Sequence, residues 1–323
     1  MKKHKICKIL LVILAIFLCV AFYELLGICV AYKKQPEVSN TTKKETKNGS
    51  WNECSENTER AVIIEKNPEA LLQRVRLIKN AKKEIILSTF AFQSDESGKL
   101  ILGALHDAAD RGVHIRLLVD GMESWIDMEG NPYFYGLSSH ENVEIKLYNK
   151  ANPLKPWKMM GRMHDKYLIA DGKRYILGGR NTYNYFLGDF PGHKNYDRDV
   201  LVVCDEPEKE NSVNQLSEYF ETIWNQEDSG YFHNNKKLAN RKSVKNAVLE
   251  LQNSYQKYFE ENKERICETD YTDETFETEK ITLVSNPIHT GSKEPVVWYQ
   301  LGELMKNAKN RVKIHTPYII CND

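Results

Sequence analysis

The pattern of hydrophobic and polar residues begins with a long apolar run. Residues 9–31 form a stretch of 23 positions with a single charge, Glu24. About 20 consecutive apolar residues cross a bilayer as a helix, so this run predicts one N-terminal transmembrane helix. Residues 1–8 contain four lysines and no acidic residue. That bias favours a cytoplasmic N-terminus and a single-pass cell-membrane protein whose main domain is extracytoplasmic.

A cleaved signal peptide is the alternative for the same run. No small-x-small cleavage pattern follows it, and neither Cys19 nor Cys29 is preceded by a small residue. We therefore expect an uncleaved anchor over residues 9–31. Residues 32–60 are rich in Lys, Glu, Asn, Thr and Ser. A stretch of that composition buries too little apolar surface to fold, which predicts a flexible stalk.

From Ala61 onward, apolar strand-like runs alternate with amphipathic helical stretches. This alternation predicts an α/β fold in which a mixed sheet is flanked by helices, and we expect the first domain to occupy residues 61–227. The expected strands are 84–92, 113–119, 143–148, 166–170, 174–177 and 200–204, and the expected helices are 68–81, 98–111 and 211–226.

Residues 228–280 differ in composition and in hydrophobic pattern from the domain before them. The periodicity of 243–265 predicts one long amphipathic helix. Residues 268–279 are acidic and rich in turn-forming residues. We therefore expect the stretch 228–280 to be a helical and acidic linker.

The sequence Lys-Asn-Ala-Lys occurs twice, each time before an apolar run. The first copy is at 79–82 and the second at 306–309, so the offset is 307 − 80 = 227. Two helix-end signals followed by strand-like runs predict an internal duplication. In this interpretation residues 281–323 begin a second repeat that is incomplete, as if the sequence were truncated.

Charge and cysteine content narrow the functional classes. The chain has 45 basic and 45 acidic residues, so no overall positive field is available to hold nucleic acid. We therefore expect no nucleic acid partner. The seven cysteines show no C-x-x-C spacing, and a zinc site is not predicted.

The segment 161–181 gathers the side chains of a candidate reaction centre. It reads G-R-M-H-D-K-Y-L-I-A-D-G-K-R-Y-I-L-G-G-R-N. His164 and Lys166 stand two residues apart at the start of an expected strand, so their side chains point to the same face. Asp171 and Gly172 form a strong hairpin-turn signal between two short apolar strands.

These residue types suit an anionic phosphate. A neutral imidazole such as that of His164 can attack phosphorus near neutral pH. Lys166 and Asn181 can donate to non-bridging oxygens, and Gly179 lets the backbone approach a ligand closely. We therefore expect no metal and no cofactor. Asp171 taken alone is better explained as a turn residue, because Asp-Gly signals a hairpin in any context.

The spacing H-x-K-x4-D-x6-G-G-x-N resembles the motif of the phospholipase D superfamily at every defined position. These positions are His164, Lys166, Asp171, Gly178, Gly179 and Asn181. The surrounding R-M-H-D-K and the later D-R-D-V-L at 197–201 are most similar to the cardiolipin-synthase branch. The resemblance covers roughly residues 68–224 and resumes at Ile281.

The resemblance implies an enzyme in which two such motifs face one cleft. One histidine forms a phosphohistidine intermediate, and the other serves as general acid and then as base. His164 would be the nucleophile or its acid partner, with Lys166, Asn181 and Gly179 on the phosphate. Asp171 would orient or charge-stabilise a histidine, either His164 or the one in the opposite half. Three further residues are candidates for a supporting role: Asp199, Arg162 and Arg180.

No second H-x-K is present in the sequence. The second motif is expected from a missing C-terminal half or from a second copy of the chain in a homodimer. The expected function is a membrane-anchored, cardiolipin synthase-like phosphodiesterase or phosphatidyltransferase, with phospholipid and the membrane as its partners. The alternatives are a dimeric, nuclease-like phosphodiesterase with a single motif, and an inactive truncated remnant.

Overall fold

A computed structural model describes residues 2–48, 59–207, 211–233 and 235–314. Its α-helices are α1 (Lys2–Ala31), α2 (Asn40–Asn48), α3 (Asn67–Asn80), α4 (Glu96–Asp110), α5 (Gly121–Asp127), α6 (Pro132–Ser138), α7 (Ser212–Trp224), α8 (Lys242–Glu261), α9 (Lys263–Cys267) and α10 (Val296–Lys306). Its strands are β1 (Arg60–Ile64), β2 (Glu84–Thr89), β3 (His114–Asp120), β4 (Val143–Tyr148), β5 (Tyr167–Ala170), β6 (Arg174–Gly178), β7 (Asp199–Val203), β8 (Ser229–Tyr231) and β9 (Phe276–Glu277). Two short 3-10 helices are η2 (Pro156–Lys158) and η3 (Lys236–Asn240).

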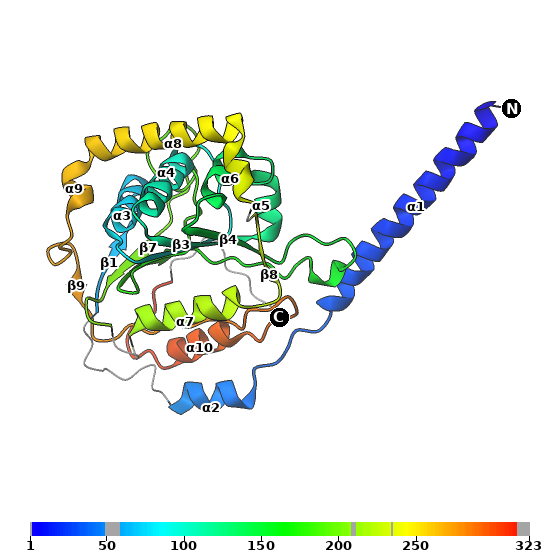
Figure 1. The fold of residues 1–323 in the computed structure, drawn as a ribbon. Helices are drawn as coiled ribbons and strands as arrows, with labels where there is room; N and C mark the ends of the chain where they lie inside the picture. The colour runs from blue at the N-terminus through cyan, green and yellow to red at the C-terminus, as the bar shows by residue number, and fades with distance from the viewer. Residues whose placement is uncertain (1, 49–58, 208–210, 234, 315–323) are drawn as a thin grey trace.

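The strands form one nine-stranded mixed sheet in the order β8-β4-β3-β2-β5-β6-β7-β1-β9 (Figure 1). Strands β2, β3 and β4 run parallel because helices connect them along the chain. From β2 across to β1, each neighbouring pair is antiparallel. The predicted mixed sheet flanked by helices is confirmed.

Helices cover both faces of this sheet. In Figure 1, α3, α4, α6 and α8 lie on one face, and α7 and α10 lie on the other. Strand β2 shows why two layers form. Its Ile85 and Leu87 belong to the core under α3 and α4, whereas Ile86 between them belongs to the core under α7. Side chains of a strand alternate between faces, so a continuous apolar strand must be covered on both sides.

The predicted long helix over 243–265 is wrong in one respect, since the structure divides it into α8 and α9 at Asn262. The side-chain amide of Asn262 donates to the carbonyl oxygen of Tyr258 at 2.9 Å. A side chain that bonds a carbonyl of the preceding turn competes with the helix backbone and favours an end there. The chain then turns so that α9 packs against α3.

The stretch 228–280 is part of the domain and not a separate linker. Strand β8 pairs with β4 at one edge of the sheet, and β9 pairs with β1 at the other. Between α9 and β9, Tyr271 is only 3% exposed. The segment between α9 and β9 surrounds a buried cation.

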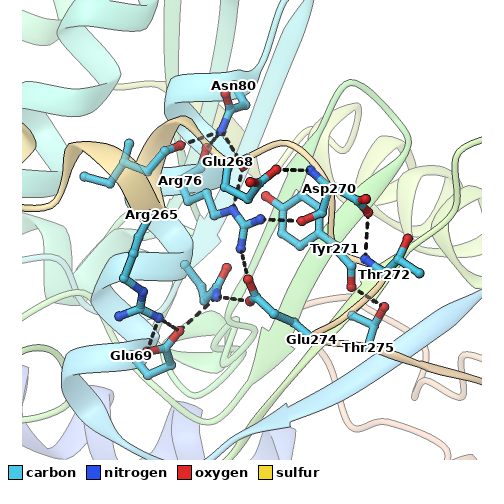
Figure 2. A network of polar contacts seen from close by, with 12 residues as sticks. Glu69, Arg76, Asn80, Arg265, Glu268, Asp270, Tyr271, Thr272, Glu274 and Thr275 are labelled. Atoms are coloured by element: carbon cyan, nitrogen blue, oxygen red, sulfur yellow. Dashed lines mark hydrogen bonds and ion pairs between the residues drawn. The ribbon is translucent and has the colours of Figure 1, made fainter.

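That cation is Arg76 of α3, whose side chain is 2% exposed (Figure 2). Its Nε donates to the carbonyl oxygen of Glu268 at 2.8 Å, and its Nη2 donates to that of Asp270 at 2.7 Å. Its Nη1 bonds Glu274 at 2.8 Å, and the guanidinium lies 3.9 Å from the ring centroid of Tyr271. These contacts satisfy the buried charge and hold residues 268–274 against α3.

The repeated Lys-Asn-Ala-Lys signal marks a helix end in both places. The Asn80 side chain donates to the carbonyl oxygen of Arg76 at 3.0 Å, and Asn307 makes the same contact with Glu303 at 2.9 Å. The expected second strand falls largely outside the described residues, and 311–314 have no strand structure. Part of the expected stalk is the helix α2, whose Thr42 bonds Glu294 at 2.7 Å.

We expect Arg76→Met to lower the free energy of unfolding by about 2–4 kcal/mol, because two buried carbonyls and a carboxylate lose their charged donor. Urea denaturation of the full chain in detergent measures this change. Arg265→Met is the matched control. Arg265 bonds Glu69 at 2.9 Å, but its side chain is 57% exposed, so its loss should cost about 1 kcal/mol or less. Equal losses in both variants would contradict a structural role for the buried cation.

Candidate active site

The β5–β6 hairpin carries the predicted motif near the centre of the sheet. Strand β5 lies between β2 and β6, and Ala170 pairs with Arg174 across the turn. In that turn Asp171 and Gly172 have φ values of 56° and 63°. Both are left-handed conformations, which Asp and Gly tolerate and which suit the twist of a hairpin. The predicted Asp-Gly turn is therefore confirmed.

His164 and Lys166 lie just before β5, at the end of the strand opposite the turn. Lys166 is 5% exposed, and its Nζ donates to the carbonyl oxygen of His164 at 2.7 Å. The Phe90 ring contacts both residues. Its centroid is 4.6 Å from the imidazole centroid and 5.2 Å from Nζ. The His164 side chain itself is exposed. The structure thus places an accessible imidazole beside a buried ammonium.

Burial and mutual repulsion set the charges of this pair. Burial lowers the pKa of Lys166 to about 8, although Asp165 and Asp197 act in the opposite direction. Burial, and then the positive charge of Lys166, lower the pKa of His164 below its usual value. Near pH 7 the imidazole is therefore neutral while most of the ammonium stays protonated. A neutral imidazole and a charged ammonium therefore coexist in that range.

Both residues line a cleft of about 380 Å³. Its walls come from residues 162–167, from Gly178 of β6, from Tyr219 of α7 and from the segment 283–297. A larger cavity of about 620 Å³ lies between α3, α4 and α8 and is lined by none of the motif residues. We place the candidate site in the smaller cleft because the nucleophilic and basic groups are there.

Three residues of the cleft were missed by sequence reasoning: Asp165, Tyr219 and Lys293. The Tyr219 hydroxyl donates to Asp165 Oδ2 at 2.7 Å, and burial raises the pKa of both groups. Lys293 Nζ reaches the carbonyl oxygen of Arg162 at 3.4 Å, and burial lowers its pKa. Tertiary folding alone brings them together, because Tyr219 and Lys293 are far from the motif in sequence.

Asp171 lies away from the cleft. Its carboxylate accepts the backbone N–H groups of Lys82, Lys83 and Glu84 at 2.9, 2.7 and 3.0 Å. The five residues from Lys166 to Asp171 span about 16 Å of extended strand. Within one copy of the chain, Asp171 therefore does not orient His164. The contacts that it makes fix the hairpin to the start of β2.

Arg180 and Asp199 lie in the core and not in the cleft. The two residues form an ion pair at 3.2 Å, and Arg74 of α3 approaches the same carboxylate at 2.9 Å. Arg180 also donates to the carbonyl oxygens of residues 64 and 65 and to Asn67. Since this guanidinium is 1% exposed, it is not placed to bind a phosphate. The pair stabilises the junction of α3, β1 and β7.

The remaining predicted residues surround the motif. Arg162 lines the cleft and donates through Nε to Asp120 at 3.0 Å. The Asp197 carboxylate occupies the place where a Cβ of residue 179 would stand, so any side chain there would displace it. Asn181 is 7% exposed, and its Oδ1 accepts the N–H of Ala91 at 3.2 Å. This bond ties the end of the motif to the segment after β2.

The fold and the site together define the class of protein. Residues 74–224 match the family model described as "Cardiolipin synthase, PLD-like domain". The chain therefore carries a phospholipase D-like domain, as the motif predicted. The matched residues include His164 and Lys166, which line the cleft.

The chain is also similar to individual proteins and to solved structures. The domain is 30% identical over 154 residues to "Cardiolipin synthase C" of Escherichia coli K12, which is 43% of this chain and 31% of that protein. It is 30% identical over 212 residues to an "Uncharacterized protein" of Helicobacter pylori J99, covering 61% and 39%. The match thus spans less than half of either relative. Among solved structures, "NucT from Helicobacter pylori" aligns with a TM-score of 0.42 and 17% identity, over 54% of this chain and 99% of that one.

We expect Lys166→Met to raise the pKa of His164, because the imidazolium then forms without a neighbouring positive charge. An NMR titration of labelled histidine in the full chain measures this. Asp171→Asn is the control, since the turn lies at the far end of β5 and the amide still accepts backbone N–H groups. An equal shift in both variants would show that Asp171 does act on His164.

Proposed function

We propose that the chain is a membrane-anchored phosphodiesterase or phosphatidyltransferase that acts on phospholipids through a phosphohistidine intermediate, as in a cardiolipin synthase. The observation that carries this proposal is the neutral, exposed imidazole of His164 beside the buried ammonium of Lys166 in one cleft. The similarity to cardiolipin synthases supports the lipid as the substrate.

In the proposed first step, an imidazole nitrogen of His164 attacks the phosphorus of a phosphodiester. A P–N bond forms as the P–O bond to the leaving alcohol breaks, and that oxygen takes a proton from a second imidazole. Lys166 stabilises the charge on the non-bridging oxygens during this step. In the second step the incoming hydroxyl gives its proton to the second imidazole, and its oxygen displaces His164. Water gives hydrolysis, and a lipid alcohol gives transfer.

The helix α1 supports a membrane location for this chemistry. Residues 5–31 are apolar enough and long enough as a helix to cross a bilayer. Most of the apolar side chains of α1 from Ile6 to Val30 are exposed in the structure. Exposing so large an apolar surface to water is unfavourable, whereas in lipid it is satisfied. We propose that α1 is a single anchor and that the domain lies on the extracytoplasmic side.

The second imidazole is part of the proposal because the sequence contains one H-x-K. It would come from a second phospholipase D-like repeat, which we propose begins near residue 281, or from a second copy of the chain. A dimer that shares its site would need both copies of His164. The nuclease-like alternative has the same requirement but a different substrate.

We expect His164→Ala to abolish turnover of phosphatidylglycerol vesicles by the reconstituted full chain, with a loss of about 10³-fold or more because the nucleophile is removed. Mass spectrometry of released glycerol and of cardiolipin follows the two outcomes, and a phosphatidyl adduct on the protein should vanish with the imidazole. His193→Ala is the matched control, since His193 is exposed and outside the cleft. Identical turnover in the wild type and in His164→Ala would refute the proposal.

Mixing experiments reveal the origin of the second imidazole. Wild-type chain is co-reconstituted with increasing proportions of His164→Ala. If two copies share a site, mixed pairs lack one imidazole, so we expect activity to follow the square of the wild-type fraction. A strictly linear decrease would show that each chain works independently of its copies. In that case the shared-site dimer is excluded.

A further inference from the structure

The loop that leads into the motif packs on the anchor helix. Residues 150–160, which we call the docking loop, contain η2 and contact the C-terminal part of α1 (Figure 1). The Tyr23 hydroxyl donates to the carbonyl oxygen of Leu154 at 3.0 Å. At Gly27, a Cβ would collide with the ring of Pro156. The absence of a side chain there permits the close approach.

These contacts lie inside the apolar run and not beyond it. Tyr23 and Gly27 precede Ala31, the last residue of α1, by eight and four residues. At 1.5 Å per residue they lie about 12 and 6 Å before the helix end. The hydrocarbon core of a bilayer is about 30 Å thick, and the 23-residue run is not much longer than that. A membrane around α1 would therefore meet the docking loop.

The single charge of the run is on the covered side of the helix. Glu24, Gly27, Ile28 and Ala31 are half-buried, whereas their neighbours Leu25, Leu26 and Val30 are exposed. Their spacing of three and four residues makes one helix face. Glu24 Oε2 has no exposed surface. The only acidic side chain of the run thus lies on the same helix face as Gly27, which the docking loop approaches.

The docking loop exposes large apolar side chains beside this contact. Leu154 is 78% exposed, Trp157 45% and Met160 58%. Helix α5 adds Trp125 at 67% and Ile126 at 68%. The first residue of α5 lies against the backbone of Lys150, where a Cβ would stand 2.6 Å from the nitrogen. Tryptophan and aliphatic tips at one end of a domain are typical of a membrane interface.

Basic side chains accompany these apolar tips. Lys150, Lys155, Lys158 and Arg162 line one cavity of about 190 Å³, together with Glu227 and Asp228. Lys158 is paired with Asp228 at 2.7 Å, and Lys155 is exposed. Lysines next to a bilayer surface attract anionic head groups.

The same loop is fixed to the candidate active site. The Asn149 side chain donates to the carbonyl oxygens of Lys158 at 2.7 Å and Gly161 at 2.9 Å. Arg162 follows directly and lines both the basic cavity and the cleft of His164. A surface held by the docking loop would therefore lie at the mouth of the cleft.

We propose that the docking loop and α5 form a contact surface for an anionic phospholipid bilayer, seated at the base of α1. This inference rests on the proposed anchoring of α1 and deepens it, because it assigns the part of the domain that meets the lipid substrate. Leu154, Trp157, Trp125 and Ile126 enter the interfacial layer, and Lys155 contacts the head groups.

Quenching of tryptophan fluorescence by brominated lipid tests this contact. The full chain is reconstituted into vesicles of phosphatidylcholine and phosphatidylglycerol with brominated acyl chains. Helix α1 contains no tryptophan, so it contributes no signal of its own. We expect strong quenching in the wild type, and loss of most of it in the double variant Trp125→Phe/Trp157→Phe. Quenching that persists in the double variant would overturn the proposal.

Phe276→Trp is the matched control for that experiment. Phe276 is 72% exposed on β9, at the opposite edge of the sheet from β8. The added tryptophan should stay unquenched, and its quenching would mean that the domain has no preferred face toward lipid, which also overturns the proposal. The measurement needs no turnover, so failure of the proposed function leaves its result intact.

Turnover provides a second, separate readout. Leu154→Asp should lower turnover of vesicle phospholipid several-fold and leave turnover of a short-chain phospholipid, dissolved below its micelle concentration, unchanged. An equal loss on both substrates would contradict the docking role of Leu154. If the wild type turns over neither substrate, the proposed function fails, and the fluorescence result still decides on the docking surface.

Discussion

The position of the candidate active site depends on a carboxylate that lies outside it. Asp171 accepts three consecutive backbone N–H groups at the start of β2, and its own N–H bonds the carbonyl oxygen of Glu84 at 2.9 Å. These bonds fix the register of β5 against its central neighbour. Because a one-residue slip turns every side chain of a strand to the opposite face, that register decides where Lys166 points. The turn at one end of the hairpin thus positions the reactive groups at the other.

Burial of Lys166 imposes the second constraint. An ammonium that is 5% exposed loses hydration, and a nearby carbonyl, the Phe90 ring and two carboxylates only partly replace it. This loss of hydration lowers the pKa of Lys166 to about 8. The ammonium therefore still carries its charge at pH 7, although little water can reach it. A poorly hydrated cation interacts strongly with a phosphate that displaces the remaining water. Burial, and then the same charge, lower the pKa of His164 and keep its imidazole unprotonated near pH 7.

The sequence predicted the fold and the reactive pair because both depend on local patterns. Alternation of apolar strands and helices predicted one sheet with helices on both faces. The i, i+2 spacing predicted that His164 and Lys166 lie on the same side of their strand. The turn position of Asp171 was predicted from the Asp-Gly signal, whereas its action on a histidine, possibly one of the opposite half, stays a prediction. Arg180 was a candidate for a supporting role, but whether a guanidinium is buried depends on partners such as Asp199 and Arg74. Tyr219 and Lys293 could not have been found, since no local pattern connects them to the motif.

The contact between the docking loop and α1 restricts how the anchored domain is oriented relative to the membrane. A stalk alone would let the domain turn in any direction, and the cleft would face the lipid only part of the time. In the structure, Tyr23 of α1 bonds Leu154, and only residues 155–163 lie between that contact and His164. A path so short, held by Asn149 and by Pro156 against Gly27, restricts the angle between anchor and cleft. Such a restriction lowers the entropy that each productive encounter costs, which is the general advantage of preorganisation. On the proposed function, the residues before the motif would therefore contribute to turnover without touching the phosphate.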